Sequence, residues 1–410
     1  MTVDYKEELM RLQQCGRLRQ LRPLAGRRGC RLQCQGRELL NLTSNDYLGI
    51  AGNPQLLSRF YEGIAASEHL LEHYGLGAAS SRLLTGDTDL AHQLEQELAT
   101  AYNEASKSGR SAALLFNSGY HANIGILPAL LGKNDLIVSD KLNHASIHDG
   151  LRLCRAAHRR FQHCDYDQLE RLLADNRHRY QRVVIVSESV FSMDGDVADL
   201  ARLVQLKNKF EALLYLDEAH AVGLYGERGL GKAEEQGVVA EIDLLVGTFG
   251  KALASIGAFV ICSQDVRDYL VNHSRSLIFT TAAPPVVLNW NSFVFQLQQT
   301  MVEQRRHLSQ LSQHLRQSLR HLNFSSTGET NIIPLIIGGD LETVRLAEKL
   351  QDHGFLILPV RPPAVPEGTA RFRLSLTADM NWQDLQGLPE ILAREHLSSR
   401  NGRINGDGGR

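Results

Sequence analysis

The sequence has few cysteines, no long apolar segment and almost no net charge. Six cysteines among 410 residues are too sparse for a disulfide scaffold, and Cys30 with Cys34 lacks the second ligand pair of a structural zinc site. The 44 lysines and arginines balance 46 acidic residues, so no overall basic field is available for nucleic acid or an anionic membrane. No apolar run approaches the roughly 18 residues of a membrane span. We therefore expect reduced thiols, no metal site, and no nucleic-acid or membrane partner.

The amino-terminal segment, residues 1–22, also lacks the apolar core of a signal or transit peptide. It carries Asp4, Glu7 and Glu8 among apolar residues, which indicates an amphipathic helix. The whole chain is 43% hydrophobic and 22% charged, as in an ordinary globular protein. At this length we expect about two or three domains. These features predict a soluble, cytoplasmic protein.

Short apolar runs recur from about residue 112 and alternate with longer amphipathic segments. Such runs, continuous and rich in β-branched residues, are typical of strands buried on both faces, and the spacers suit crossover helices. The pattern predicts an α/β fold with a largely parallel central sheet. The predicted strands are 112–116, 135–140, 183–189, 213–220, 243–249 and 257–263.

The pattern changes after "TTAAPP" (280–285). A long polar helix over 302–322 is followed by short strand-like segments at 332–339 and 370–377. The tail is rich in glycine, asparagine and arginine and has almost no apolar residue, which predicts disorder. The N-terminal segment, with one helix and the strand-like "RELLNLTS", should pack on a neighbouring domain. The predicted divisions are the N-terminal segment 1–53, a large domain 54–285, a smaller C-terminal α/β domain 286–397 and the tail 398–410.

Polar residues follow the predicted strands, which is where ligands bind in open α/β sheets. Gly119 precedes a helix start, so free backbone amides there could hold a phosphate. Taken singly, each such residue has an ordinary explanation as a cap, a turn hydroxyl or a solvated charge. Their shared position at one predicted sheet edge favours a common site instead. Besides Gly119, these residues are His144, Ser192, Asp217, His220, Thr248 and Lys251.

A lysine, a carboxylate, a histidine that can stack and a phosphate cradle are together the parts of a pyridoxal 5'-phosphate site. The amine of Lys251 would form a Schiff base with the cofactor aldehyde. The carboxylate of Asp217 would keep the pyridine nitrogen protonated and so make the ring an electron sink. The sequence therefore predicts a pyridoxal-phosphate enzyme.

Two other enzyme classes lack their required motifs. A P-loop ATPase needs G-x-x-x-x-G-K-[ST], but "GTFGKA" lacks the first glycine at the right spacing and the hydroxyl after the lysine. A metal hydrolase needs ligands at short fixed spacing, such as H-E-x-x-H, and none of the 16 histidines forms such a pair. A non-catalytic pseudo-enzyme stays open in principle. The presence of both Lys251 and Asp217 argues against it.

Seven segments also match a known family in collinear order. They are "SNDYLG", "SGYHANIG", "LNHASIHDG", "FSMDGD", "LDEAHAVGLYGERGLG", "TFGKAL" and "RPPAVPEGTARFRLSLT". The chain thus resembles the α-oxoamine synthases, fold-type I pyridoxal-phosphate enzymes that join an amino acid to an acyl thioester with loss of carbon dioxide. The match extends from about Leu18 to Ala378. It implies a fold-type I transferase that forms a homodimer with the active site at the subunit interface.

The resemblance implies a role for each matching position. Lys251 binds the cofactor aldehyde, Asp217 pairs with the pyridine nitrogen, and His220 hydrogen-bonds the ring oxygen. His144 stacks on the ring face and also contacts substrate. The remaining cofactor contacts are Gly119, Tyr120, Ser192 and Thr248, and the remaining substrate contacts are Arg19, Asn45, Arg361 and Ala364, with Arg361 meeting the substrate carboxylate.

Ala364 departs from the family pattern, because threonine is common there in the branch that the C-terminal segment resembles. Loss of one substrate hydrogen bond would cost about 0.5–1.5 kcal/mol, enough to change affinity but not reaction class. Different segments also point to different members of the family. The amino acid (alanine or glycine), the acyl chain, and its carrier (coenzyme A or acyl carrier protein) therefore stay open.

Overall fold

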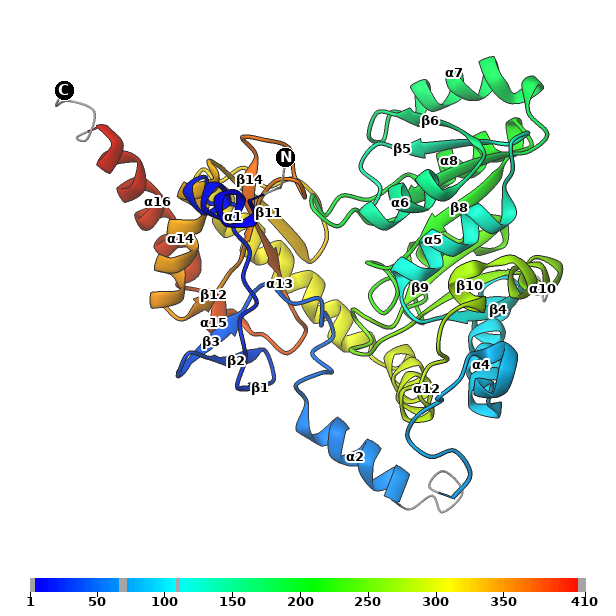
Figure 1. Ribbon diagram of the computed structural model, residues 1–410. Coiled ribbons are helices and arrows are strands. Elements are labelled where there is room, and N and C mark those ends of the chain that lie inside the picture. Colours follow the sequence, from blue (N-terminus) through cyan, green and yellow to red (C-terminus); the bar gives the residue numbers. More distant parts are fainter. Residues whose placement is uncertain (1–3, 66–71, 108–110, 405–410) are drawn as a thin grey trace. The chain divides into compact units, whose positions relative to one another are not determined.

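The computed structural model describes residues 4–65, 72–107 and 111–404, without the side chains of 398–404. The chain forms two compact units (Figure 1). The larger unit comprises Gln55–Ser192 and Val197–Arg305. The smaller unit comprises Met1–Pro54, Met193–Asp196 and Arg306–Arg410. Each unit has its own sheets and its own apolar core.

The larger unit is built on a seven-stranded sheet with the order β4-β10-β9-β8-β7-β5-β6. The neighbours from β9 to β6 are parallel, whereas β10 is antiparallel to both β4 and β9. The expected α/β fold with a mainly parallel central sheet is therefore confirmed. The strands are β4 (Ser111–Phe116), β5 (Leu136–Asp140), β6 (Ala157–Phe161), β7 (Val183–Glu188), β8 (Leu213–Asp217), β9 (Leu244–Thr248) and β10 (Ala258–Ser263).

Burial explains which of these strands the sequence pattern could reveal. Every residue of β5, β7 and β9 is buried, so helices cover both faces of the sheet and the strands are continuously apolar. The pattern did not predict β6, whose sequence "AHRRF" is largely exposed or half-buried. This strand is the last in the sheet and pairs with β5 alone. An edge strand exposed to water has no need of a continuous apolar run.

Helices pack on the sheet around a core that includes Leu127, Ile147, Val186 and Tyr215. Two of them contact each other and hold site residues: α5 (Gly119–Leu130) and α6 (Ala145–Leu153). The other α-helices of this unit are α2 (Pro54–Ala65), α4 (Asp89–Ser106), α7 (Tyr166–Asn176), α8 (Leu200–Lys209), α9 (Lys232–Glu235), α10 (Gln264–His273), α11 (Arg275–Ile278) and α12 (Pro285–Gln299), with short turns η1 (Arg82–Gly86), η2 (Arg177–Arg179) and η3 (Val239–Glu241).

The smaller unit contains a four-stranded sheet, β1-β2-β3-β12, and a three-stranded antiparallel sheet, β11-β14-β13. Leu32, Cys34, Leu39 and Leu356 form a small core beside the first sheet. The strands are β1 (Gly26–Arg28), β2 (Arg31–Cys34), β3 (Arg37–Asn41), β11 (Ile332–Gly338), β12 (Phe355–Leu356), β13 (Pro359–Val360) and β14 (Ala370–Ser375). The helices are α1 (Tyr5–Gln14), α13 (Val302–His321, mostly in this unit), α14 (Asp340–Asp352), α15 (Trp382–Leu385) and α16 (Leu388–Ile404).

The two compact units do not coincide with the divisions drawn on the sequence. The larger unit continues through α12 to Arg305, whereas the sequence pattern changes at 285. Helix α16 extends to Ile404, into the segment 398–410 that the composition predicts to be disordered, and residues 405–410 lie outside the described residues. The N-terminal segment belongs to the smaller unit, where β3 pairs with β12. None of the helices in the described part of the chain is long and apolar enough to cross a membrane.

Candidate active site

The carboxyl ends of the parallel strands bring the predicted cofactor residues to one edge of the sheet in the larger unit. Asp217, the last residue of β8, pairs in register with Glu188, the last residue of β7. On its other side it pairs with Val246 of β9, two residues before Thr248. Thr248 is followed by Lys251, and β5 is followed by His144. Parallel pairing therefore places polar groups together that are distant in sequence.

Asp217 is buried, with 4% of its surface exposed, and its carboxylate is held by two donors. The side-chain amide of Asn123 donates to Oδ2 at 2.8 Å, and the backbone N–H of Ala219 donates to Oδ1 at 2.9 Å. The same amide donates to Ser146 Oγ at 2.9 Å, while the Tyr215 hydroxyl donates to Asn123 Oδ1 at 2.5 Å. This network fixes the orientation of the carboxylate. The sequence analysis missed Asn123; its only signal was an amide within the apolar helix "HANIGIL".

His144 is the N-cap of α6, and its ring is oriented by Ser146. Its Nδ1 lies 2.7 Å from Ser146 Oγ and accepts the backbone N–H of that residue at 3.3 Å, so we place the ring proton on Nε2. Burial, and then the positive charge of Lys251, lower the pKa of His144, while Asp217 acts in the opposite direction. The imidazole is therefore neutral near pH 7, as suits a ring that stacks on another ring.

The titration of His144 predicts a pH-dependent stability. Folding lowers the pKa of His144 from its ordinary value of 6.5. When the pH falls below that value, the unfolded chain therefore binds a proton at His144 more readily than the folded chain does. The free energy of unfolding should therefore fall as the pH decreases through 6.5. His144→Asn should flatten this dependence in urea unfolding measured above and below that pH. The exposed His178→Asn serves as control, and an equal flattening in both variants would contradict the prediction.

Glu188 is a second buried acid at this edge, and the sequence analysis did not select it. It accepts the backbone N–H of His144 at 2.5 Å. Burial, followed by the negative charge of Asp217, raises its pKa well above the ordinary range, while Lys251 lowers it. Glu188, His144, Asp217 and Lys251 therefore share one electrostatic field. The signal in the sequence was a glutamate at the end of the apolar run "VVIVSE".

Lys251 lies in the turn over residues 249–257 that connects β9 and β10. The turn is closed by the N–H of Phe249 donating to Gly257 O at 3.0 Å and by the N–H of Ala254 donating to Lys251 O at 2.9 Å. Thr248 braces its start, because its hydroxyl donates to Gly257 O at 2.9 Å and accepts the N–H of Gly250 at 3.1 Å. These hydrogen bonds hold the backbone on both sides of the lysine.

Helix α5 begins beside Thr248 and supplies a potential anion cradle. A side chain at Gly119 would place its Cβ 3.9 Å from Thr248 Cβ, so the first turn of the helix lies against the end of β9. Ser118 caps the helix by accepting the N–H of His121 at 3.2 Å. The preceding amides, of Gly119 and Tyr120, lie at the positive end of a twelve-residue helix. The Tyr120 hydroxyl itself donates to Asp149 Oδ2 at 2.9 Å.

His220 and Ser192 also follow strands of this sheet. His220 is buried in the turn three residues after Asp217. Ser192 is half-buried and follows the short bridge between Val190 and Val197. All the sequence-predicted cofactor residues therefore belong to the larger unit.

Apart from His144, the predicted substrate contacts belong to the smaller unit instead. Arg19 donates to Pro362 O at 2.9 Å, and Arg361 donates to Gly16 O. Burial lowers the pKa of Arg361, and the positive charge of Arg19 lowers it further, so the two guanidinium groups lie near each other. The Nε of Arg361 is buried and has no hydrogen-bond partner among the described residues. Ala364 is exposed on the turn that follows, where its N–H donates to Arg361 O at 3.1 Å.

Asn45 lies beside an arginine that the sequence analysis did not select. Its Oδ1 accepts from Arg373 Nη1 and from the Tyr47 hydroxyl, both at 3.1 Å. Arg373 also donates to Ser375 Oγ at 3.0 Å and to the Tyr47 hydroxyl at 2.9 Å. These hydrogen bonds orient the guanidinium. In sequence it was one of two arginines in "ARFRLSLT", and nothing distinguished it from the other.

Comparisons with known proteins agree with this arrangement. The sequence family of class I and II aminotransferases matches residues 37–392. The 8-amino-7-oxononanoate synthase of Chlorobaculum parvum is 49% identical over 390 residues, which cover 95% of this chain and 97% of that protein.

Two solved structures share the fold. The 8-amino-7-oxononanoate synthase of Francisella tularensis has a TM-score of 0.72 at 26% identity, covering 88% of this chain and 99% of that one. The serine palmitoyltransferase of S. paucimobilis, solved with a bound PLP-myriocin aldimine, has a TM-score of 0.86 at 27% identity, covering 96% and 97%. The family expected from the motifs is thereby confirmed. The chain belongs to the class I and II aminotransferase family and, within it, groups with the 8-amino-7-oxononanoate synthases.

Proposed function

We propose that the protein condenses L-alanine with a pimeloyl thioester to give 8-amino-7-oxononanoate, carbon dioxide and free thiol, a step of biotin biosynthesis. The observation that carries this proposal is the grouping of Lys251, Asp217 and His144 at one sheet edge, in a chain 49% identical to a synthase of that name. When bound, pyridoxal 5'-phosphate supplies an aldehyde that joins the amino acid and a ring that draws electron density from its α-carbon.

The residues of the larger unit fit such a cofactor in charge and in shape. The start of α5 offers the amides of Gly119 and Tyr120 to the phosphate, with the positive end of the helix dipole behind them. The buried carboxylate of Asp217 suits a protonated pyridine nitrogen, because a nearby anion favours the charged form. Further polar contacts would come from Ser192, Thr248 and His220. The fit rests on a buried acid and a helix start that the same sheet edge brings together.

The remaining groups would orient the reacting atoms and move protons. The amine of Lys251 would hold the cofactor between turnovers and then take the α-proton of alanine and return it. The neutral ring of His144 would lie on the cofactor face, fixed by Ser146. Glu188 would hold the His144 backbone in place through its hydrogen bond. Burial of Glu188 strengthens its interaction, because few water molecules compete there.

The smaller unit would recognise the anionic ends of the substrates. A guanidinium presents a planar fork that matches a carboxylate, and Arg373 is oriented by Asn45 and Tyr47. We assign the amino-acid carboxylate to Arg373 with Asn45, beside the contact already implied for Arg361. Arg19, whose positive charge lies close to that of Arg361, would attract an acidic group of the acyl donor. Ala364, on the turn that follows Arg361, would offer the substrate no hydroxyl to hydrogen-bond.

The protein would act as a cytoplasmic homodimer that binds no nucleic acid or membrane. Large apolar side chains on the larger unit favour a subunit contact, since Leu76 and Leu84 are each 78% exposed and Phe279 is 70% exposed. The acyl chain would arrive on coenzyme A or on acyl carrier protein.

Release of free thiol tests the proposed reaction directly. We expect the cofactor-loaded protein to turn over L-alanine with pimeloyl-CoA at least about tenfold better than glycine with acetyl-CoA, because a pocket built for one extra methyl group discriminates by about 10–200-fold. Pimeloyl-acyl carrier protein, compared with pimeloyl-CoA, identifies the natural carrier. Preference for glycine with acetyl-CoA would overturn the proposal and indicate glycine C-acetyltransferase instead.

A further inference from the structure

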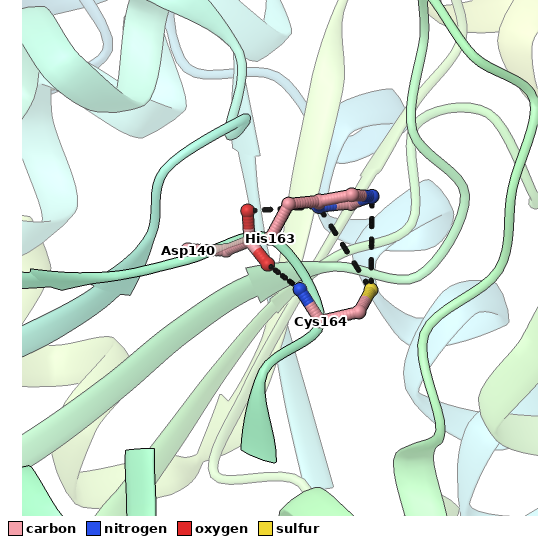
Figure 2. A group of neighbouring side chains, drawn as sticks. All are labelled: Asp140, His163 and Cys164. Carbon is pink, nitrogen blue, oxygen red and sulfur yellow. Dashed lines mark hydrogen bonds and ion pairs between the residues drawn. The ribbon is translucent and has the colours of Figure 1, made fainter. Parts of the chain in front are cut away.

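Asp140, His163 and Cys164 bring three different donor groups together at the ends of β5 and β6 (Figure 2). His163 Nδ1 lies 3.0 Å from Asp140 Oδ1. Cys164 Sγ lies 3.8 Å from the same nitrogen and 3.7 Å from Nε2. One ligand atom from each residue lies within 4.8 Å of the others. The proposed condensation assigns no role to any of these side chains.

Strand pairing and backbone donors hold the cluster in place. Asp140 pairs with Phe161 in the parallel register of β5 and β6, and its side chain is only 1% exposed. Its Oδ2 accepts the N–H of Cys164 at 2.9 Å, and its Oδ1 accepts the N–H of Leu142 at 2.8 Å. The carboxylate is therefore oriented before any ligand arrives. His163 and Cys164 are half-buried, which leaves the group accessible from solvent.

We infer that this cluster, the Asp140–His163–Cys164 site, binds a divalent transition metal of the zinc type. Zinc takes cysteine sulfur at about 2.3 Å, histidine nitrogen at about 2.0–2.1 Å and carboxylate oxygen at about 2.0–2.2 Å. Tetrahedral angles then separate the ligand atoms by roughly 3.3–3.6 Å. The observed separations of 3.0 Å and 3.8 Å lie on either side of this range. The Cys164 side chain must turn toward Nδ1 to admit the ion, because its sulfur lies almost equally far from both ring nitrogens.

The donor set also selects the kind of ion. A thiolate and an imidazole favour zinc, cobalt and related ions over magnesium and calcium, which prefer oxygen ligands alone. The carboxylate and the thiolate together balance the two positive charges. Three protein ligands leave a fourth tetrahedral position for water, as in open zinc sites. The spacing rules for sequence motifs could not find this set, because strand pairing unites Asp140 with residues 23 and 24 positions away.

Binding of the metal ion releases one proton and moves another, and it changes no oxidation state. Cys164 Sγ faces the imidazole ring in Figure 2, so a rotation about its Cα–Cβ bond is required to direct the sulfur toward Nδ1. Metal–sulfur, metal–nitrogen and metal–oxygen bonds form, and the thiol proton goes to solvent. The imidazole proton resides on Nε2, since Nδ1 now binds the ion in place of its hydrogen bond to Asp140. The ion would tie the end of β5 to the end of β6.

Cobalt substitution tests the site in the full-length, untagged, cofactor-loaded protein. We expect one equivalent of Co²⁺ to produce the visible d–d bands of a tetrahedral complex with sulfur-to-metal charge transfer. Cys164→Ser should remove the charge-transfer band. It should also weaken Co²⁺ binding by at least about 10–100-fold, because even residues that only hydrogen-bond to a metal ligand contribute that much to metal affinity. Cys154→Ser is the matched control, because Cys154 is also half-buried but lies beside the apolar core, where its sulfur donates to the backbone carbonyls of Leu127 and Leu131.

Two results would overturn the inference. One is an unchanged spectrum when Co²⁺ is added to the parent protein. The other is the same spectrum and affinity in the parent protein and in a folded Cys164→Ser variant. The visible absorption of the bound cofactor verifies folding of each variant independently of the metal. A rise in melting temperature with Zn²⁺, present in the parent and Cys154→Ser but absent in Cys164→Ser, is expected as a second measurement, because a ligand that binds only the folded state stabilises it.

Discussion

Lys251→Ala should abolish condensation and remove the visible absorption of the lysine-bound cofactor. The substitution deletes both the covalent anchor of the cofactor and the base for the α-proton, and a positioned general base alone contributes about 10²–10⁴-fold. We therefore expect a loss of more than about 10⁴-fold in thiol release. Absorption spectra of the purified protein give a readout that does not depend on turnover.

Lys141→Ala provides the matched control for this experiment. Lys141 follows β5 at the same edge of the sheet, but its amine is exposed and donates to Gln162 Oε1 at 3.2 Å. Its removal should leave both the spectrum and the rate near those of the parent protein. If Lys251→Ala retained the visible band and the turnover, the lysine would be a structural residue and another amine would have to bind the cofactor.

Asp217→Asn should slow condensation by about 10²–10³-fold while leaving the fold intact, the loss typical when one preorganised electrostatic group is removed. Asparagine has nearly the same shape, and the Ala219 N–H can still donate to its oxygen. It lacks the negative charge that keeps the pyridine nitrogen protonated. The expected result is a fall in kcat with the cofactor still bound, measured by steady-state kinetics and absorption together.

Asp217→Asn should also change the pKa values of neighbouring groups, in addition to the reaction rate. Asp217 raises the pKa of Glu188 and opposes the lowering of the pKa of His144, so its neutralisation should shift both toward lower values. Asp243→Asn is the control, because that carboxylate pairs with Lys207 at 3.0 Å and accepts the N–H of Leu214 at the opposite edge of the sheet. Near-normal activity of Asp217→Asn would mean that the buried acid is structural.

Periodicity alone could predict the central strands and the residues at their ends. A strand covered on both faces must be apolar along its whole length, which makes β5, β7 and β9 visible in the sequence. A polar residue at the end of such a run is conspicuous, as with Asp217 and Lys251. Residue chemistry then suggested roles for Lys251 and Asp217, and the roles of the other residues came from resemblance to a family, since periodicity carries no chemistry.

Residues that act through others were invisible in the sequence. Asn123 and Glu188 are polar groups within apolar segments, and either could equally have been an ordinary cap or a surface residue. Their importance depends on contacts with Asp217 and His144, which come from other strands and helices. Arg373 gave no signal for a related reason: its neighbour Asn45 is 328 positions away in the sequence.

By itself, the sequence determined the α/β class, most strands of the larger sheet, and the lysine and aspartate of the proposed cofactor site. These features depend on apolar runs and short motifs, which are visible in the amino-acid sequence. Only the tertiary structure decided that β6 completes the sheet, that Asn123 and Ser146 connect Asp217 to His144, and that Asp140 meets His163 and Cys164. The physical reason is that hydrogen-bonded strand pairing and burial join residues without regard to their separation along the chain.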